Sequence, residues 1–340
     1  MTSLEAIQKV SFAEIRGWAQ DDHGKALSAF QLSAQEILQK GHGFQRHSQF
    51  GGERKDWLDV CGMALASNDA QKFFESHFQP LKISTDRSLF TGYYEPQVQG
   101  SLTRTDEFQV PLYSKPHDLI AGQNYFTRKE IEQGALKDRA LEICFLRSWP
   151  EAYFIHIQGN GRVVLPQGKA LRLSFAAKNG QAYKSIGQVL LARGIGSPQS
   201  MSMQFLLEWM KANADETRAL LWENPSFIFF QASEVIDPDL GAIGAAKVPL
   251  TPLRSLAVDR SMWAFGTPLF LNTHRPPEAG GAIFGQLMIA QDTGSAIKGI
   301  QRGDVYWGWG GKAALNAGHM KSTGEMIALL PKLLANRLAP

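Results

Sequence analysis

Cysteine is scarce in this sequence: its 340 residues include only two, Cys61 and Cys144, and neither has a CxxC partner. A thiolate zinc site is therefore not expected. Each cysteine lies in an apolar run, so we predict two buried thiols that pack as small hydrophobic side chains, while a disulfide between them stays open. The eight histidines are scattered without an HExxH motif or a calcium-type acidic loop, so no metal is expected.

Long apolar runs and basic runs are also missing. No segment approaches the ~18 apolar residues that a membrane-spanning helix needs, and residues 1–6 lack the basic start and apolar core of a signal peptide. The net charge of +3 is spread along the chain, whereas nucleic-acid-binding proteins concentrate Lys and Arg, so we expect no nucleic acid partner. From these features, a cytoplasmic protein and a processed, exported one both stay open.

What the sequence does contain is a change of texture along its length. Apolar residues at helical spacing, such as Phe12, Ile15 and Trp18, predict a helical part within residues 5–80. Further helices are predicted at 181–194 and at 200–222, the second capped by Ser200 or Ser202. Short apolar runs between turn residues predict strands at 90–96, 153–158, 162–165 and 227–231, with a hairpin joining the second and third.

The region from Val248 onward is dense in Gly and Pro turns, which predicts a small β-barrel. Two carboxylates, Asp292 and Asp304, lie where apolar strands meet glycine-rich loops. Burial at such a junction would raise a carboxyl pKa and keep a proton for a glycosidic oxygen. From the residues alone, a turn cap at Asp292 and a surface charge at Asp304 remain the favoured alternative.

Other catalytic motifs are incomplete or absent. The triplet 292–294 reads Asp-Thr-Gly, but an aspartic protease needs two such carboxylates, and the chain has one triplet. The glycines before Lys312 lack phosphate-loop spacing, and Ala313 stands where Ser or Thr would meet magnesium. No GxSxG elbow occurs, which argues against an α/β-hydrolase.

Seven ordered motifs resemble those of the MltA family of lytic murein transglycosylases from Gram-negative bacteria. The first 80 residues match that family only weakly. The motifs that carry the resemblance are FTGYYEP at 90–96, FQVPLY at 108–113, IQGNG at 157–161, AKNGQAYKSIG at 177–187, MSMQ at 201–204, NPSFIFF at 224–230, and the block that joins VPL at 248–250, AQDTGSAIKG at 290–299 and GDVYWG at 303–308.

The resemblance implies a mainly β fold with an α-helical N-terminal part. A double-psi β-barrel domain would be built from residues 1–105 and 238–340. Residues 106–237 would form a second, β-rich domain inserted into the barrel, with a substrate groove between the two.

The implied enzyme is a peptidoglycan lytic exotransglycosylase, a carbon–oxygen lyase. It would cleave the β-1,4 bond between N-acetylmuramic acid and N-acetylglucosamine and leave a 1,6-anhydromuramyl end. The family's single acid/base maps onto Asp304 by its place before the Tyr-x-Gly segment. The lead-in here reads Arg302-Gly303, where the family often has His-Phe.

Other residues carry supporting roles in this interpretation. Asp292 would hold a loop or tune Asp304, with a second-carboxylate mechanism as the competing role. Aromatic faces suit sugar rings, and amide or ammonium groups suit hydroxyl and N-acetyl oxygens. On that basis the substrate-binding candidates are Tyr93, Tyr94, Gln158, Lys178, Asn179, Tyr183, Lys298 and Trp307.

The resemblance also sets expectations about surroundings. Partners would be peptidoglycan glycan strands, together with cell-wall synthesis or division proteins, and the protein would be a monomer that needs no cofactor. It would be periplasmic, with an export signal encoded upstream and an outer-membrane lipid anchor left open. Two alternatives remain: a non-catalytic polysaccharide-binding double-psi barrel, which could tolerate Asn at position 304, and a cytoplasmic enzyme with an unrelated substrate.

Overall fold

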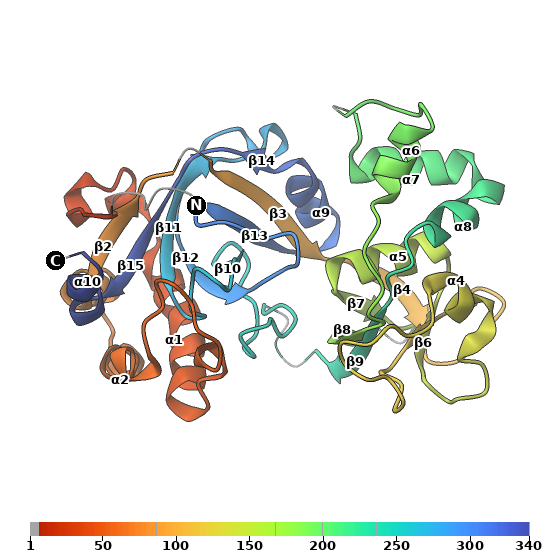
Figure 1. The fold of residues 1–340 in the computed structure, drawn as a ribbon, viewed down its shortest axis with the longest axis horizontal. Helices are drawn as coiled ribbons and strands as arrows, with labels where there is room; N and C mark the ends of the chain where they lie inside the picture. The colour runs from red at the N-terminus through yellow and green to blue at the C-terminus, as the bar shows by residue number, and fades with distance from the viewer. Residues whose placement is uncertain are drawn as a thin grey trace. The chain divides into compact units, whose positions relative to one another are not determined.

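The computed structural model describes residues 7–85, 87–166, 168–198, 200–235, 237 and 239–339. The chain divides into two compact units (Figure 1). The first unit comprises residues 1–94, 239–308 and 315–340, and the second comprises residues 95–238 and 309–314. None of the helices in the described residues has both the length and the apolar character to cross a bilayer.

A nine-stranded sheet organises the first unit, in the order β1-β2-β15-β11-β12-β10-β13-β3-β14. Most strand pairs among its described residues are antiparallel, but β10 runs parallel to β12. Segments from both ends of the chain therefore lie side by side, as in the pairing of β2 with β15. The strands are β1 (Ile7–Lys9), β2 (Phe78–Ile83), β3 (Leu89–Glu95), β10 (Ser255–Val258), β11 (Pro268–His274), β12 (Ile283–Asp292), β13 (Arg302–Trp309), β14 (Lys321–Ser322) and β15 (Glu325–Pro331).

Helix α1 covers part of this sheet and forms the centre of its largest core. It is capped by Asp22, whose side chain accepts a hydrogen bond from the Lys25 backbone at 3.2 Å. Its buried stripe, including Phe30, packs against β12 and its neighbours. The helices and short helical turns associated with this part of the sequence are η1 (Phe12–Glu14), η2 (Trp18–Gln20), α1 (His23–Gln39), η3 (His42–Phe44), η4 (Arg54–Asp56), α2 (Leu58–Ala66), α3 (Ala70–His77), η6 (Pro277–Ala279), α9 (Gly310–His319) and α10 (Lys332–Leu338).

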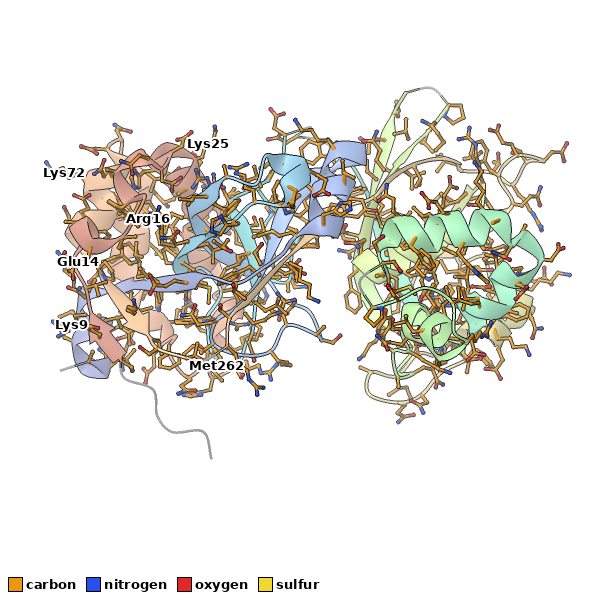
Figure 2. The ribbon with its side chains drawn as sticks, turned by 90° about the horizontal axis from the view of Figure 1, so that it is seen from above. Lys9, Glu14, Arg16, Lys25, Lys72 and Met262 are labelled. Atoms are coloured by element: carbon orange, nitrogen blue, oxygen red, sulfur yellow. The ribbon has the colours of Figure 1, made fainter. Side chains whose placement is uncertain are left out.

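Charged side chains of the N-terminal segment point away from this core. Figure 2 shows Lys9, Glu14, Lys25 and Lys72 on the outside of the first unit. The buried residues behind them are almost all apolar. This separation of charge from apolar surface is what the helical spacing predicts for a half-buried layer.

A six-stranded sheet organises the second unit, in the order β5-β6-β4-β7-β8-β9. Among the strand pairs of its described residues, β4 and β7 run parallel and the others run antiparallel. The elements of this unit are β4 (Gln97–Ser101), β5 (Val110–Tyr113), α4 (Arg128–Glu130), η5 (Ile131–Ala135), β6 (Glu142–Leu146), α5 (Trp149–Gln158), β7 (Asn160–Val164), β8 (Ala170–Lys178), α6 (Ile186–Ala192), α7 (Met203–Ala212), α8 (Ala214–Trp222) and β9 (Ile228–Glu234).

The predicted strand at 153–158 is wrong, because these residues belong to helix α5. Ser148 caps the helix, Glu151 completes the capping box, and a proline lies at its start. Five consecutive residues of α5 are buried. Apolar and polar residues therefore do not alternate here, and the pattern does not distinguish a buried helix from a buried strand. The helix ends at Gly159, which adopts a left-handed conformation with φ of 72°. Strand β7 consequently pairs with β4 and with the following strand β8, and not with residues 153–158 as predicted.

Other predicted elements are confirmed with shifted ends. The strand predicted at 90–96 is β3, which stops before Pro96, and the strands after Val248 correspond to β10–β13. The helix predicted at 200–222 is two helices, capped at its start by Ser202. Asn213 interrupts it with a non-helical φ of −124° and ψ of 56°. Both cysteines are buried and free.

Candidate active site

Two carboxylates occupy equivalent positions on either side of strand β10. Ala257 of β10 is in register with Asp292 of β12 on one side and with Asp304 of β13 on the other. Residues in register on neighbouring strands project to the same face of a sheet. At ~4.8 Å per strand, the two α-carbons are separated by about 10 Å. The sheet thus presents both acids on one face.

Asp304 is held by a short chain of hydrogen bonds. The Thr91 hydroxyl donates to Asp304 Oδ1 at 2.5 Å, and Arg302 Nη2 donates to Thr91 Oγ1 at 2.8 Å. Arg302 also donates to the carbonyl oxygens of Leu89 and Gly303. Asp304 Oδ2 receives no hydrogen bond from any described residue.

The environment of Asp304 favours its protonated form. Burial raises the pKa of this carboxyl above its ordinary value, and the nearby Asp292 charge acts in the same direction. The Thr91 hydrogen bond and the Arg302 charge oppose that rise without cancelling it. Part of Asp304 nevertheless remains accessible. An acid with a raised pKa and one accessible oxygen is suited to deliver a proton.

Asp292 has a different set of partners, which occupy both of its oxygens. Oδ1 accepts from the backbone nitrogens of Ala245 at 3.0 Å and Thr293 at 2.9 Å, and Oδ2 accepts from the Tyr93 hydroxyl at 3.0 Å. Burial still raises its pKa. The preceding Gln291 is fully buried and connects β12 to helix α1. Asp292 therefore ties the loop containing Ala245 to a strand that is itself anchored.

Tyr93 reaches Asp292 through its hydroxyl from strand β3. It belongs to a small buried cluster with Ala257 and Tyr306, and its ring centroid is 5.3 Å from that of Tyr306. The small side chain of Ala257 leaves room for these rings on the face that carries both carboxylates. Burial and the charges of Asp292 and Asp304 raise the Tyr93 pKa well above its usual value, so the hydroxyl acts as a neutral donor to Asp292.

The remaining first-unit candidates are less open to a ligand than the sequence suggests. Tyr94 is buried, and burial raises its pKa to about 12. Trp307 is also buried, and its indole nitrogen donates to the Met320 sulfur at 3.4 Å. Lys298 is exposed and lies 3.7 Å from Asp259.

A cavity of about 550 Å³ lies beside Lys298. It is lined by Lys298, Arg302 and Met262, among other residues of the first unit; Figure 2 labels Met262. Arg302 therefore borders this cavity while its guanidinium reaches Thr91.

Four candidates lie in the second unit. Lys178 and Tyr183 are exposed, and Gln158 is partly exposed at the end of α5. Asn179 is fully buried; its amide nitrogen donates to the carbonyls of Phe126 and Pro225 and its oxygen accepts from the Phe227 backbone, each at 2.8 Å. Because both amide protons are used, Asn179 holds loops together and is not placed to bind a sugar.

Sequence reasoning missed Thr91 and Arg302 as the residues that orient the acid. Thr91 and Tyr93 are two apart on β3, so they share a face of the strand. Arg302 and Asp304 have the same spacing on β13. The spacing of two residues therefore indicates which side chains share a face of each strand. It does not reveal that β13 and β3 are neighbours in the sheet, which is a tertiary feature.

Comparison with known protein families gives two matches. Residues 89–231 match the model of the MltA specific insert domain, and residues 254–330 match the model of the 3D domain. The two matches together cover both carboxylates and most strands of each sheet.

Curated proteins of similar sequence share one name. A membrane-bound lytic murein transglycosylase A from Vibrio cholerae is 37% identical over 246 residues, covering 71% of this chain and 65% of the relative. A homolog from Buchnera aphidicola is 31% identical over 263 residues, covering 76% of this chain and 70% of the relative. The aligned part is thus just under two thirds of the Vibrio protein's length.

Solved structures match over nearly the whole chain. A membrane-bound lytic murein transglycosylase from Agrobacterium tumefaciens aligns with a TM-score of 0.88 and 33% identity, covering 98% of this chain and 99% of that one. Escherichia coli MltA with bound chitohexaose aligns with a TM-score of 0.72 and 30% identity, covering 92% and 90%.

Proposed function

The chain belongs to the MltA family, and on that premise we propose that it is a lytic transglycosylase of peptidoglycan. The bond cleaved is the β-1,4 link between N-acetylmuramic acid and N-acetylglucosamine. The product carries a 1,6-anhydromuramyl end. The proposal draws on the names of the relatives and on the bound chitohexaose in E. coli MltA.

Asp304 performs both proton transfers in this mechanism. Its protonated carboxyl first gives a proton to the glycosidic oxygen as the bond to C1 breaks. The resulting carboxylate then removes the proton of the muramyl C6 hydroxyl while that oxygen forms the bond to C1. Asp304 gives one proton and takes one back, so it ends the reaction in its starting form. The reaction therefore consumes no water and requires no cofactor. Positioned proton transfer of this kind contributes ~10²–10⁴-fold to the rate.

One observation carries the assignment of Asp304. Its Oδ1 is fixed by Thr91, whereas its Oδ2 has no partner among the described residues and its pKa is raised. Asp292 has the raised pKa without the open oxygen. We therefore assign Asp292 to supporting the loop at Ala245 and raising the Asp304 pKa, not to a second chemical step.

The surrounding assignments are proposals on the same premise. We propose that the nine-stranded sheet forms the double-psi barrel and that residues 106–237 act as the inserted domain. We further propose that Lys178, Tyr183, Gln158 and Lys298 contact glycan strands. A periplasmic location, with association to the outer membrane, is supported by the description of the relatives as membrane-bound.

Digestion of purified sacculi tests the function. The wild-type protein is expected to release muropeptides whose ends resist borohydride reduction, because an anhydro end has no free hemiacetal. Asp304→Asn, which keeps the shape of the side chain and its contact with Thr91, is expected to lose activity by ~10²-fold or more. Mass spectrometry before and after reduction identifies the product.

A matched control is Asp292→Asn, which retains an acceptor for the two backbone donors. It is expected to keep anhydro products at a reduced rate. Reducible ends from the wild type would make the chain a hydrolase. Sedimentation with sacculi and no soluble product would make it a binding module, and full activity of Asp304→Asn would remove that residue from the mechanism.

A further inference from the structure

Arg302 is an arginine in the position two residues before the acid, on the same face of β13 as Asp304. It contacts Thr91 by a hydrogen bond, and Thr91 contacts Asp304 by another. Arg302 is half-buried, so it has limited freedom to reorient. Its second terminal nitrogen is engaged by the carbonyls of Gly303 and Leu89. The guanidinium is thus held on both sides.

We propose that Arg302 is a positioning residue that places the catalytic proton on Oδ2 of Asp304, acting through the Thr91 hydroxyl. This inference rests on the proposed function, since it concerns the proton that the acid delivers.

Hydrogen-bond polarity carries the argument. A guanidinium has donors only, so Thr91 Oγ1 must accept from Arg302. The single Thr91 proton is then directed at Asp304 Oδ1, the acceptor that lies 2.5 Å away. Oδ1 is consequently an acceptor in the resting enzyme. In the reverse arrangement, a protonated Oδ1 of Asp304 would donate to the Thr91 oxygen. The Thr91 proton would then have no acceptor among the described residues, which is costly in a partly buried site.

The acid proton is therefore expected on the other oxygen. Oδ2 has no partner among the described residues, so a proton there is available to a glycosidic oxygen. Without Arg302, the Thr91 hydroxyl could rotate and accept from Asp304, which would turn the acid proton away from substrate. Arg302 thus selects one of two proton arrangements without touching the substrate.

Gly303 makes this arrangement sterically feasible. It lies between Arg302 and Asp304 and faces the opposite side of the strand. A Cβ at this position would lie 3.1 Å from a Leu256 methyl carbon and 3.2 Å from the Phe90 ring. Glycine therefore lets β13 approach its neighbours closely, which keeps Arg302 within reach of Thr91.

The test compares pH profiles of kcat/KM on sacculi for the wild type, Arg302→Met, Arg302→Lys, Thr91→Val and Thr91→Ser. Arg302→Met is expected to lower the maximum by about tenfold, because the proton is no longer oriented. It should also move the alkaline limb to higher pH, since the Arg302 charge lowers the Asp304 pKa. Arg302→Lys and Thr91→Ser should restore most of the rate, because each keeps the polarity of the chain.

The double variant isolates the pathway. In the Thr91→Val background, Arg302→Met is expected to cause little further loss in maximum rate, because Arg302 acts through the hydroxyl that is already absent. Equal losses in both backgrounds, or an unchanged rate and limb in Arg302→Met, would overturn the proposal. Circular dichroism and thermal melting establish that each variant is folded, and Thr91→Val provides an independent route if Arg302→Met is not. A wild-type protein that forms no anhydro ends refutes the proposed function itself, whereas anhydro products with unaffected variants refute only the role of Arg302.

Discussion

Two buried carboxylates, Glu132 of the second unit and Asp304 of the first, have very different surroundings. In the second unit, Glu132 is almost inaccessible and lies 3.3 Å from Arg128 and 3.9 Å from Arg218, while the Trp222 indole donates to it at 2.7 Å. In the first unit, Asp304 has one hydroxyl donor, and its nearest guanidinium lies behind that hydroxyl. Glu132 is surrounded by partners, although burial still raises its pKa, whereas Asp304 keeps one oxygen uncommitted.

Glu95 is a second carboxylate of the second unit that is paired with arginines. Glu95 is fully buried, with Arg162 at 3.6 Å and Arg172 at 3.3 Å. Arg162 also stacks on the Trp309 ring at 4.2 Å. Buried charges that are paired on both sides serve structure, because removing either partner strands the other in a low dielectric. An acid that must exchange a proton has to avoid that saturation.

Removing the Glu132 carboxylate is the change expected to have the largest effect on stability. Glu132→Ala leaves the nearly buried Arg128 without its counter-ion, and we expect a loss of about 3–5 kcal/mol in the unfolding free energy. The measurement is urea denaturation combined with amide hydrogen exchange, which locates the loss in the second unit. Glu208→Ala, an exposed change on α7, is the control and should stay within about 0.5 kcal/mol. A comparable effect from both variants would mean that the pairing has no special weight.

Removing the Asp292 carboxylate tests the acid that lies in register beside Asp304 and has both of its oxygens occupied. Asp292→Ala leaves the backbone donors of Ala245 and Thr293 without their acceptor, for an expected loss of about 2–3 kcal/mol. Hydrogen exchange at the Ala245 amide should increase sharply. Thr293→Ser, which keeps that backbone donor, is the control. An unchanged exchange rate at Ala245 would show that Asp292 does not hold this loop.

How far the sequence anticipates this contrast depends on the range of the interactions. Asp292 and Asp304 could be singled out together because both lie where an apolar strand meets a glycine-rich loop, and the helical N-terminal region was predicted from Phe12, Ile15 and Trp18. The Thr91 contact joins residues 213 positions apart, so no local pattern announces it. The strand predicted at 153–158 is wrong although a local signal for the helix exists. The capping box at Ser148 marks a helix start, but the run of β-favouring residues that follows it led to the prediction of a strand.

The candidate binding residues also differ in whether their side chains are exposed or are used in contacts within the fold. Tyr183 and Lys178 are exposed as a binding role requires, whereas Asn179, their neighbour in the same motif, is consumed by three backbone contacts. Asn-Gly is a turn signal, and a turn asparagine often satisfies backbone groups. Residue type alone therefore does not separate an amide that meets sugar from one that closes a loop.

A smaller effect is expected from removing the Tyr93 hydroxyl. Tyr93→Phe keeps the ring against Tyr306 but removes the donor to Asp292 Oδ2, for a loss of about 1 kcal/mol. The lost donor also lets the Asp292 pKa rise, because that hydrogen bond lowers it. Thermal melting at several pH values measures both effects. An unchanged melting temperature at every pH would remove any special role for the contact.

The smallest expected effect concerns the stability contributed by Asp304 itself. Replacing this carboxylate is expected to stabilise the protein at neutral pH, whereas replacing Glu132 or Asp292 is expected to destabilise it. Burial raises the Asp304 pKa, so the folded state binds this proton more tightly than the unfolded chain does. Stability from this group is therefore greatest below the unfolded pKa of about 4 and declines as pH rises through the folded value. Asn carries no charge, so Asp304→Asn should match the wild type at low pH and be more stable at neutral pH. Unfolding measured from pH 3 to pH 7 tests this, with the exposed Asp59→Asn as control. A stability loss at neutral pH would place Asp304 with the saturated carboxylates of the second unit, because an acid kept for proton transfer is one that the fold tolerates and does not need.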